Sequence, residues 1–164
     1  MNYADIKIAD VANGKGVRVS LFVSGCTHHC KGCFNPQAWD FCYGKQFTEE
    51  DMDRIINELD HPYVAGLSIL GGEPLEHQNQ QGLLPLLKKV KERFPEKDIW
   101  IYTGDVIENI VLRSDLSSKL KSDILEKCDY LVDGPFIKEQ YDPDLEFRGS
   151  SNQRIINLKE WFEK

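Results

Sequence analysis

The stretch VRVSLFVSGCTHHCKGCFN, residues 17 to 35, places a predicted strand directly before three closely spaced cysteines. Apolar residues occupy the odd positions from Val17 to Val23, which is the alternation typical of a strand. Cys26, Cys30 and Cys33 follow, separated by three and then by two residues. The three thiols therefore lie on one short loop at the carboxyl end of that strand.

Three thiols at this spacing are typical of a metal centre. Iron–sulfur clusters are held by cysteine thiolates, usually four. The chain has only two other cysteines, Cys42 and Cys128, and neither completes an obvious set of four. A cubane cluster with three protein ligands keeps one iron open, and a catalytic metal site needs an open coordination position. The spacing therefore favours a catalytic iron–sulfur cluster.

Other interpretations of the cysteines remain open at this point. A structural zinc site needs a fourth ligand, which His28 or His29 could supply, although one turn would have to fold all four side chains around the ion. The thiols could also be unligated. Disulfides are disfavoured, because the cysteine count is odd and the polar segment 1–14 does not resemble a secretory signal.

The composition predicts a single globular domain, residues 1–164. Hydrophobic residues make up 41 % of the chain and charged residues 29 %, which are values of a folded protein. No apolar run approaches the length of a membrane span. The net charge of −7 argues against nucleic acid as a partner, because phosphate binding needs a basic face. Reduced thiols without a signal or an anchor lead us to expect a cytoplasmic protein.

Strands and helices are predicted to alternate along the chain. Helical patterns follow Thr48, which is the predicted cap of the first helix, and begin again near Pro85, with Pro95 as the stop. A third helical stretch covers residues 106–127 and contains a predicted turn near 114–118. The predicted strands cover residues 3–8, at an edge, 17–23, 65–70, 98–102, 130–132 and 154–158.

This alternation predicts an α/β protein with a parallel sheet and right-handed crossovers. Ligands of such sheets bind outside the carboxyl ends of the strands. The chain is short for a closed eight-stranded barrel of about 250 residues, so we expect a partial, open (β/α) barrel of parallel strands. The segments that follow the predicted strands, and should meet at one rim, are the cysteine loop, Gly71-Gly72-Glu73, Thr103-Gly104 and Asp133-Gly134.

The pair Gly71-Gly72 allows backbone conformations closed to other residues and lets a ligand approach the main chain. Glu73, the next residue, could face an ammonium group. An isolated Gly-Gly-Glu-Pro would more simply be a plain turn with an exposed glutamate. The three-cysteine loop on the same predicted rim favours the functional interpretation.

The Cys-x3-Cys-x2-Cys motif and Gly71-Gly-Glu-Pro74 together resemble the radical S-adenosylmethionine enzymes. Gly32 stands where an aromatic residue is usual, and Phe34 follows the last cysteine, a pattern of the activase branch. Over nearly its whole length the chain resembles the activating proteins of anaerobic ribonucleoside-triphosphate reductases. The matching segments are Asn2-Tyr3, Asn13-Gly14, residues 21–26, residues 94–100, residues 132–134 and residues 148–153.

This resemblance implies that Cys26, Cys30 and Cys33 hold one 4Fe–4S cluster, whose fourth iron binds the amino and carboxylate groups of S-adenosyl-L-methionine. The main chain at Gly71, Gly72 and Glu73 would receive the ammonium group. An electron from the reduced cluster would release methionine and a 5′-deoxyadenosyl radical. That radical would take a hydrogen atom from a glycine of the large subunit of the reductase and leave a glycyl radical. Because the cofactors carry the chemistry, no side chain is predicted to be catalytic.

The same resemblance implies a reduced flavodoxin or a similar electron donor. Thr103 and Asp133 could contact the ribose or bind a cation near the substrate carboxylate, although an aspartate before glycine is also a common turn residue. Polar residues beyond the last predicted helix could shape the mouth of the site or a partner surface, or form a solvated loop; these are Arg148, Asn152 and Arg154.

Two other functions remain open on the sequence. One is a small radical S-adenosylmethionine enzyme that acts on a small molecule, such as a deazapurine synthase. The segment 148–153 favours the activase over that alternative. The other is a zinc-stabilised binding module without enzymatic activity.

Overall fold

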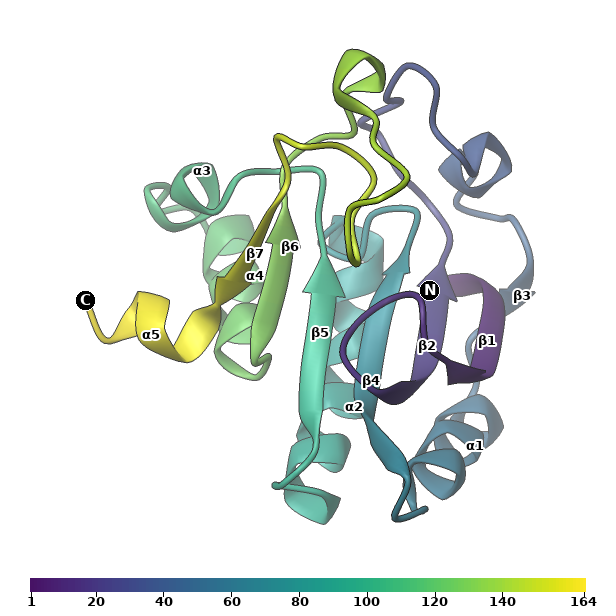
Figure 1. The fold of residues 1–164 in the computed structure, drawn as a ribbon. Helices are drawn as coiled ribbons and strands as arrows, with labels where there is room; N and C mark the ends of the chain where they lie inside the picture. The colour runs from purple at the N-terminus through teal and green to yellow at the C-terminus, as the bar shows by residue number, and fades with distance from the viewer.

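A computed structural model describes all residues, 1–164, as a seven-stranded sheet with helices (Figure 1). The strands are β1 (Asn2–Asp10), β2 (Val17–Val23), β3 (Lys45–Gln46), β4 (Val64–Gly71), β5 (Asp98–Tyr102), β6 (Tyr130–Asp133) and β7 (Arg154–Asn157). The helices are α1 (Glu49–Leu59), α2 (His77–Arg93), α3 (Ile107–Val111), α4 (Leu116–Glu126) and α5 (Leu158–Phe162), with 3-10 turns η1 (Pro36–Trp39) and η2 (Lys138–Gln140). No helix has both the length and the apolar character that a membrane span requires.

The strand order is β3-β1-β2-β4-β5-β6-β7, and the sheet is open, with β3 and β7 at its edges. The four central strands β2, β4, β5 and β6 pair in parallel, as predicted for an α/β protein. The prediction of an entirely parallel sheet was wrong, because β1, β3 and β7 pair antiparallel to their neighbours. A parallel pair needs a crossover, usually a helix, whereas the segment between β6 and β7 contains only η2.

The position of β1 also differs from the prediction. The strand lies between β3 and β2 and not at the edge, because the two-residue strand β3 pairs with its outer side. That pairing involves only Asn2 and Tyr3 of β1. A strand as short as β3 carries too little periodicity to be found from sequence.

The alternation along each central strand separates two faces of the sheet. The odd-numbered residues point toward α1, α2 and α4, which lie behind the sheet in Figure 1. They form the centre of a 26-residue hydrophobic core. The members that are fully buried include Val19, Leu21, Val23, Leu67, Ile69, Ile99, Ile101 and Leu131. The even-numbered residues face the opposite side, on which the site lies.

Helix α2 begins at His77, eight residues before the predicted start at Pro85, which lies inside the helix. The first turns are polar in sequence, so the apolar periodicity that marks a helix is missing there. Asn79 and Gln80 are nevertheless buried, and their amide groups donate to backbone carbonyls of the neighbouring turn. Asn79 also donates to the carbonyl of Ser24, just after β2, over 3.0 Å, so a tertiary contact helps to hold this early turn of the helix.

The start of α1 agrees with the sequence, whereas α5 was not predicted and takes Leu158 from the predicted last strand. Thr48 and Asp51 form a reciprocal capping box at the start of α1. An interruption within residues 106–127 is confirmed, but it lies earlier than the predicted turn near 114–118: α3 ends at Val111, and α4 begins at Leu116 with Asp115 as its N-cap.

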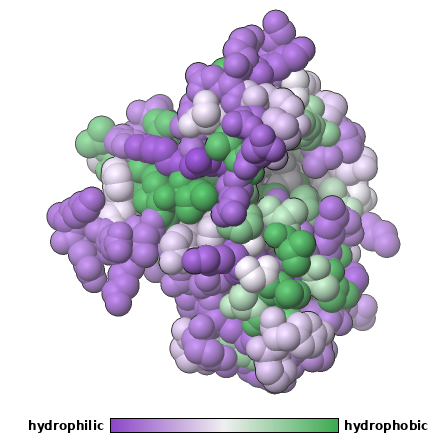
Figure 2. Space-filling model, viewed as in Figure 1, coloured by the Kyte–Doolittle hydropathy of each residue, from purple (hydrophilic) through white to green (hydrophobic).

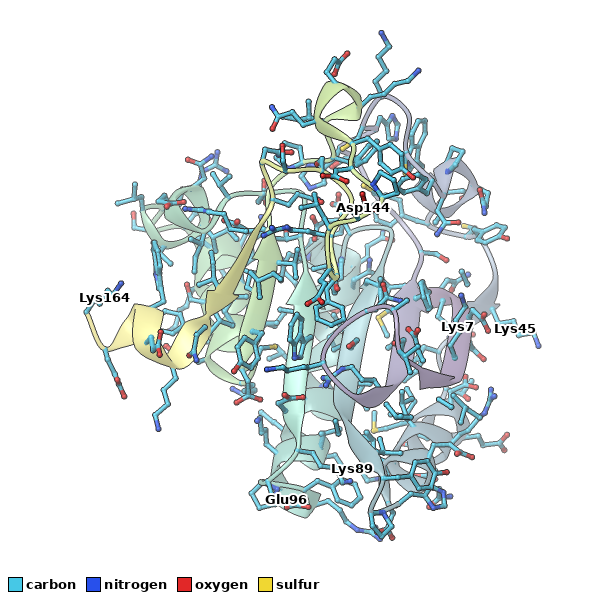
Figure 3. The ribbon with its side chains drawn as sticks, in the orientation of Figure 1. Lys7, Lys45, Lys89, Glu96, Asp144 and Lys164 are labelled. Atoms are coloured by element: carbon cyan, nitrogen blue, oxygen red, sulfur yellow. The ribbon has the colours of Figure 1, made fainter.

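Figure 2 shows the even-numbered side of the sheet, where hydrophobic residues form separate patches. The exposed residues include Ile155 on β7, and Ile8 and Val11 around the connection between β1 and β2. Charged side chains such as Lys45 and Lys164 lie at the periphery (Figure 3). No single apolar surface covers this side of the molecule.

Candidate metal and cofactor site

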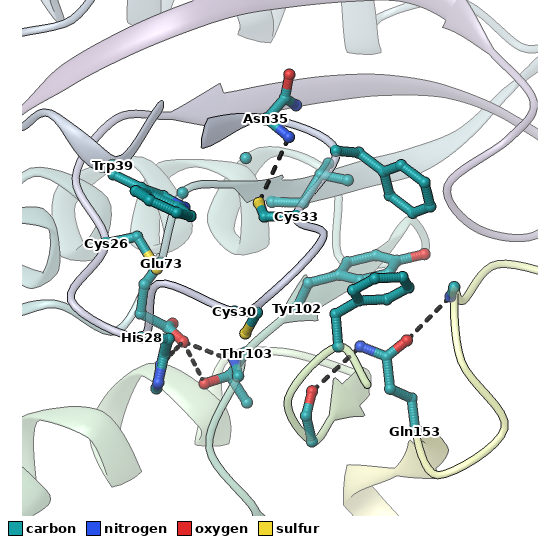
Figure 4. Close-up of a pocket in the computed structure, with 18 of the residues that line it drawn as sticks. Cys26, His28, Cys30, Cys33, Asn35, Trp39, Glu73, Tyr102, Thr103 and Gln153 are labelled. Atoms are coloured by element: carbon teal, nitrogen blue, oxygen red, sulfur yellow. Dashed lines mark hydrogen bonds and ion pairs between the residues drawn. The ribbon is translucent and has the colours of Figure 1, made fainter. Parts of the chain in front are cut away.

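A cavity of about 240 Å³ lies at the carboxyl ends of the parallel strands, where the sequence predicts the site (Figure 4). Its walls come from the cysteine loop, the turns after β4 and β5, and the segment between β6 and β7. Most of the predicted site residues line it: Cys26, Cys30, Cys33, Gly71, Gly72, Glu73 and Thr103. Asp133 does not line this cavity.

The three cysteines of the motif are free and partly buried, and they face the same cavity. The amide of Cys33 donates to the carbonyl of Cys30 over 3.1 Å, which forms a tight turn. Asn35 donates its amide to the Sγ of Cys33 over 3.4 Å. A backbone amide aimed at a sulfur is the kind of outer contact that orients a metal ligand.

Burial raises the pKa of the Cys26 thiol to about 11, although the amides of His28 and His29 act in the opposite direction. A bound metal would compensate for this burial, because coordination deprotonates the thiol. No group of three or more His, Cys, Asp or Glu side chains already stands in metal-binding geometry. Three cysteine thiols that line one cavity are the donor set of an iron–sulfur cluster, whose irons each bind a separate thiolate, so the residues present fit that group.

The histidines of the loop have other partners, which weakens the zinc interpretation. The Nε2 of His28 lies 2.8 Å from the Oε1 of Glu73, and this hydrogen bond raises the pKa of His28. The ring of His29 stacks on Trp39, with the ring centroids 4.3 Å apart. Neither ring is held as a fourth ligand for the three thiols.

Gly71 and Gly72 form a turn that packs closely on the cysteine loop. Gly71 has a φ of +112°, and a Cβ there would lie 2.5 Å from the carbonyl oxygen of Val23. A Cβ on Gly72 would lie 2.6 Å from the carbonyl oxygen of Gly25. The amides of Gly72 and Glu73 donate to those same two carbonyls. Only glycine allows the turn after β4 to approach so closely.

Glu73 is almost completely buried and accepts four hydrogen bonds. Its Oε1 accepts from the side chains of His28 and Thr103 and from the amide of Gly104, over 2.7–2.8 Å. Its Oε2 accepts from the amide of Leu75 over 2.8 Å. The carboxylate therefore joins three segments of the rim, and the protein itself supplies its partners.

Asp133 lies behind the rim and is fully buried. Its carboxylate accepts from the amide of Ile107 over 3.0 Å and from the guanidinium of Arg154. Arg154 also forms two hydrogen bonds with Glu108, which hold the pKa of Glu108 at about 2. This arrangement joins β6, β7 and α3 and leaves the Asp133 carboxylate facing protein groups.

Two of the polar residues that follow the last predicted helix, Arg148 and Asn152, have different contacts. Arg148 lines the cavity and donates weakly to the carbonyl of Gln153 over 3.4 Å. Asn152 donates to the carbonyl of Pro135 over 2.8 Å and so closes the loop between β6 and β7.

Several residues of the cavity were not identified from the sequence. Phe22, Leu70 and Tyr102 are the last even-numbered residues of their strands, and the alternation that predicted the strands could have placed them. Tyr102 donates to the carbonyl of Phe147 over 2.7 Å, and burial raises its pKa. Further lining residues come from irregular segments that carry no periodic signal, among them Phe136, Gly149 and Gln153.

Comparison with known proteins gives a consistent result. The family model described as a 4Fe-4S single cluster domain matches residues 12–156. The anaerobic ribonucleoside-triphosphate reductase-activating protein of Haemophilus influenzae is 43 % identical over 161 residues, which are 97 % of this chain and 99 % of that protein.

Relatives with the same name occur in other organisms. The protein of Escherichia coli K12 is 37 % identical over 97 % of this chain and 100 % of its own length. That of Enterobacteria phage T4 is 39 % identical over 94 % of this chain and 93 % of its own length. The chain belongs to the family of anaerobic ribonucleoside-triphosphate reductase-activating proteins, with a 4Fe-4S single cluster domain.

Proposed function

We propose that this protein cleaves S-adenosyl-L-methionine reductively at a 4Fe–4S cluster and thereby generates a glycyl radical on an anaerobic ribonucleoside-triphosphate reductase. The observation that carries the proposal is the convergence of Cys26, Cys30 and Cys33 with the Gly71-Gly72 turn on one cavity. Three thiols leave one iron of a cubane cluster open for a ligand. The adjacent turn offers main-chain groups next to that position.

The proposal assigns binding and positioning roles to the residues of this chain. Cys26, Cys30 and Cys33 would hold the cluster, and the main chain at Gly71 and Gly72 would receive the ammonium group of S-adenosylmethionine. A reduced cluster held there would supply the one electron needed for reductive cleavage of the bond between sulfur and C5′ of S-adenosylmethionine, and so the radical chemistry directed at the target glycine. The protein orients the reactants and keeps water away.

The contacts of Glu73 refine its proposed role. Its side chain already accepts four hydrogen bonds, so an ammonium group would meet the main chain of this turn before it met the carboxylate. Thr103 lines the cavity and remains a candidate contact for the ribose. The sequence-based proposal that Asp133 binds the cofactor would require its pairing with Arg154 to open first.

The wider parts of the proposal follow from family membership. Residues 1–164 would form a single domain whose open sheet is a partial (β/α) barrel of the radical S-adenosylmethionine type. The partner would be the large subunit of the reductase, and the electron would come from a reduced flavodoxin or a similar donor. A cytoplasmic location would suit an oxygen-sensitive cluster on reduced thiols.

Anaerobic electron paramagnetic resonance of the reconstituted protein tests the proposal. With dithionite, S-adenosylmethionine and the reductase, we expect a glycyl-type doublet that the Cys30→Ala variant cannot produce. Cys42→Ala is the matched control, because Cys42 is exposed and lies outside the cavity. Formation of 5′-deoxyadenosine without the doublet would point to another substrate. Zinc in place of iron, with no cluster signal, would refute the enzymatic function.

A further inference from the structure

The loop that carries the three cysteines has few hydrogen bonds of its own. Between Cys26 and Cys33, the backbone–backbone hydrogen bonds are those from Cys26 to Trp39 and from Cys33 to Cys30. A loop with so few internal bonds depends on side-chain contacts for its shape. These contacts come from the residues between the first two cysteines.

Each of those three residues contacts a different part of the protein. Thr27 donates its amide and its hydroxyl to Glu76, over 2.8 and 2.7 Å, at an exposed position. His29 stacks on Trp39, within the segment that follows the loop. His28 is the only one with a buried partner, because the Glu73 side chain is 3 % exposed.

The partner of His28 connects the loop to a distant strand end. The Oε1 atom that contacts His28 also accepts from the hydroxyl of Thr103 and the amide of Gly104, which follow β5. One carboxylate oxygen therefore joins the cysteine loop, the turn after β4 and the turn after β5. Figure 4 shows His28, Glu73 and Thr103 together at one side of the cavity.

The His28 ring also occupies the space that a side chain at position 104 would need. A Cβ built on Gly104 would lie 2.7 Å from the Cδ2 of His28 and 2.9 Å from its Nε2. The ring thus lies directly on the backbone of Gly104. His28 therefore combines a hydrogen bond to the buried carboxylate of Glu73 with close packing on the turn after β5.

We propose that His28 is a positioning residue that locks the Cys26–Cys30 segment against Glu73 and Gly104, so that the cysteine loop keeps the shape needed to retain the cluster. The consequence for the cluster rests on the proposed function, whereas the locking of the loop does not. Without the lock, the thiols would occupy many arrangements, and those able to hold the cluster would be a smaller fraction. His28 would act through the loop and would not touch the reacting atoms.

The first experiment measures hydrogen–deuterium exchange in the protein without cluster. In His28→Ala, we expect the hydrogen-bonded amides of the loop, those of Cys26, Thr27 and Cys33, to exchange about tenfold faster than in the wild type, as loss of a hydrogen bond to Glu73 would allow. His28→Gln should restore most of the protection, because its amide can donate from the position of Nε2. His61→Ala is the control, since His61 lies outside the cavity and is partly exposed.

The second experiment measures cluster retention after anaerobic reconstitution. When an iron chelator is added, His28→Ala should lose iron about tenfold faster than the wild type, and His28→Gln should lose it at a rate close to the wild type. Electron paramagnetic resonance of the reduced protein should show a broader distribution of cluster signals in His28→Ala. This spectroscopic change would not follow from a general loss of stability, which thermal unfolding of each variant measures separately.

A third variant tests the packing of the His28 ring on Gly104 without changing any residue of the cysteine loop. Gly104→Ala should displace the His28 ring and reproduce the faster exchange and iron loss of His28→Ala. In the His28→Ala background, the same substitution should add little, because the ring that it would meet is gone. The two substitutions should therefore be strongly non-additive.

The outcomes separate the two proposals. Unchanged loop exchange in His28→Ala, or additive effects of the Gly104 and His28 substitutions, would overturn the positioning role. Faster loop exchange with unchanged cluster retention would also overturn it, because the lock would then not serve the cluster. A wild-type protein that binds no 4Fe–4S cluster would instead refute the proposed function, while the exchange experiment would still decide whether His28 locks the loop.

Discussion

The Nη1 atom of Arg18 on β2 lies 2.7 Å from the Oδ1 of Asp98 at the start of β5, although β4 lies between the two strands. Arg18 is fully buried and also donates to the hydroxyl of Ser68 and the carbonyl of Leu67, both on β4. One guanidinium therefore ties three parallel strands together on the even-numbered side of the sheet.

Replacing Arg18 should destabilise the protein strongly. Arg18→Met leaves the acceptors on β4 and β5 without a partner, and we expect the free energy of unfolding to fall by about 3 kcal/mol, at the low end for a broken buried pair because Asp98 is partly exposed. Urea unfolding measures the change. In the control Lys89→Met, loss of the exposed pair with Asp53 should cost about 0–1 kcal/mol. Equal effects would show that the buried network contributes no more than a surface pair.

Glu108 should make stability depend on pH under acidic conditions. Arg154 lowers its pKa from 4.5 to about 2 in the folded protein. The folded state therefore gains stability from this carboxylate above pH 4.5, and the gain disappears as the pH falls toward 2. The side chain is 43 % exposed, so solvent screening limits the gain to about 1 kcal/mol.

The Glu108→Gln variant measures this contribution. Its free energy of unfolding should lie below that of the wild type at pH 6, and the two should converge as the pH falls from 5 to 2. Urea unfolding at a series of pH values gives both curves. A constant difference between them over this range would rule out the ion pair with Arg154 as the source.

Replacement by alanine should lower stability to different extents at two glycines with positive φ. Gly71 and Gly134 have φ values of +112° and +100°. A Cβ on Gly71 would meet the backbone of Val23 at 2.5 Å, whereas the nearest atom to a Cβ on Gly134 lies 3.5 Å away. Gly134→Ala should cost about 1–2 kcal/mol from backbone strain alone.

Gly71→Ala should cost clearly more than Gly134→Ala, because the turn after β4 must also move away from β2. Thermal unfolding of both variants provides the comparison. The displaced turn should in addition weaken binding of S-adenosylmethionine, which equilibrium dialysis measures on the reconstituted protein. A smaller loss of stability in Gly71→Ala than in Gly134→Ala would contradict the contact with Val23.

Tyr102 should hold the long segment between β6 and β7 in place. Tyr102→Phe removes the hydrogen bond to the carbonyl of Phe147, which we expect to cost about 1 kcal/mol. The measurable local effect is faster hydrogen exchange in residues 145–150. Tyr63→Phe is the control, since Tyr63 is 62 % exposed. If residues 145–150 exchange at the same rate in both variants, the Tyr102 hydroxyl does not hold this segment in place.

The regular elements of the fold could be predicted well where the pattern was strong. Alternation located β2, β4, β5 and β6, and the capping residues located the start of α1. The prediction failed where a structure depends on distant partners. The early start of α2 is an example, because the polar residue Asn79 is buried while it donates to the carbonyl of Ser24, 55 residues earlier in the chain.

The sequence by itself determined the three thiols on one loop, the glycines after the next strand and the succession of the central strands along the chain, because these depend on spacing and on local strand patterns. Only the tertiary structure decided how the residues of the rim pair with one another. Glu73 contacts His28 and Thr103, which are 45 and 30 residues away in the chain, and Asp133 contacts Arg154 behind the rim. Hydrogen bonds between distant segments leave no local periodicity, so their partners emerge only when the sheet brings the strand ends together.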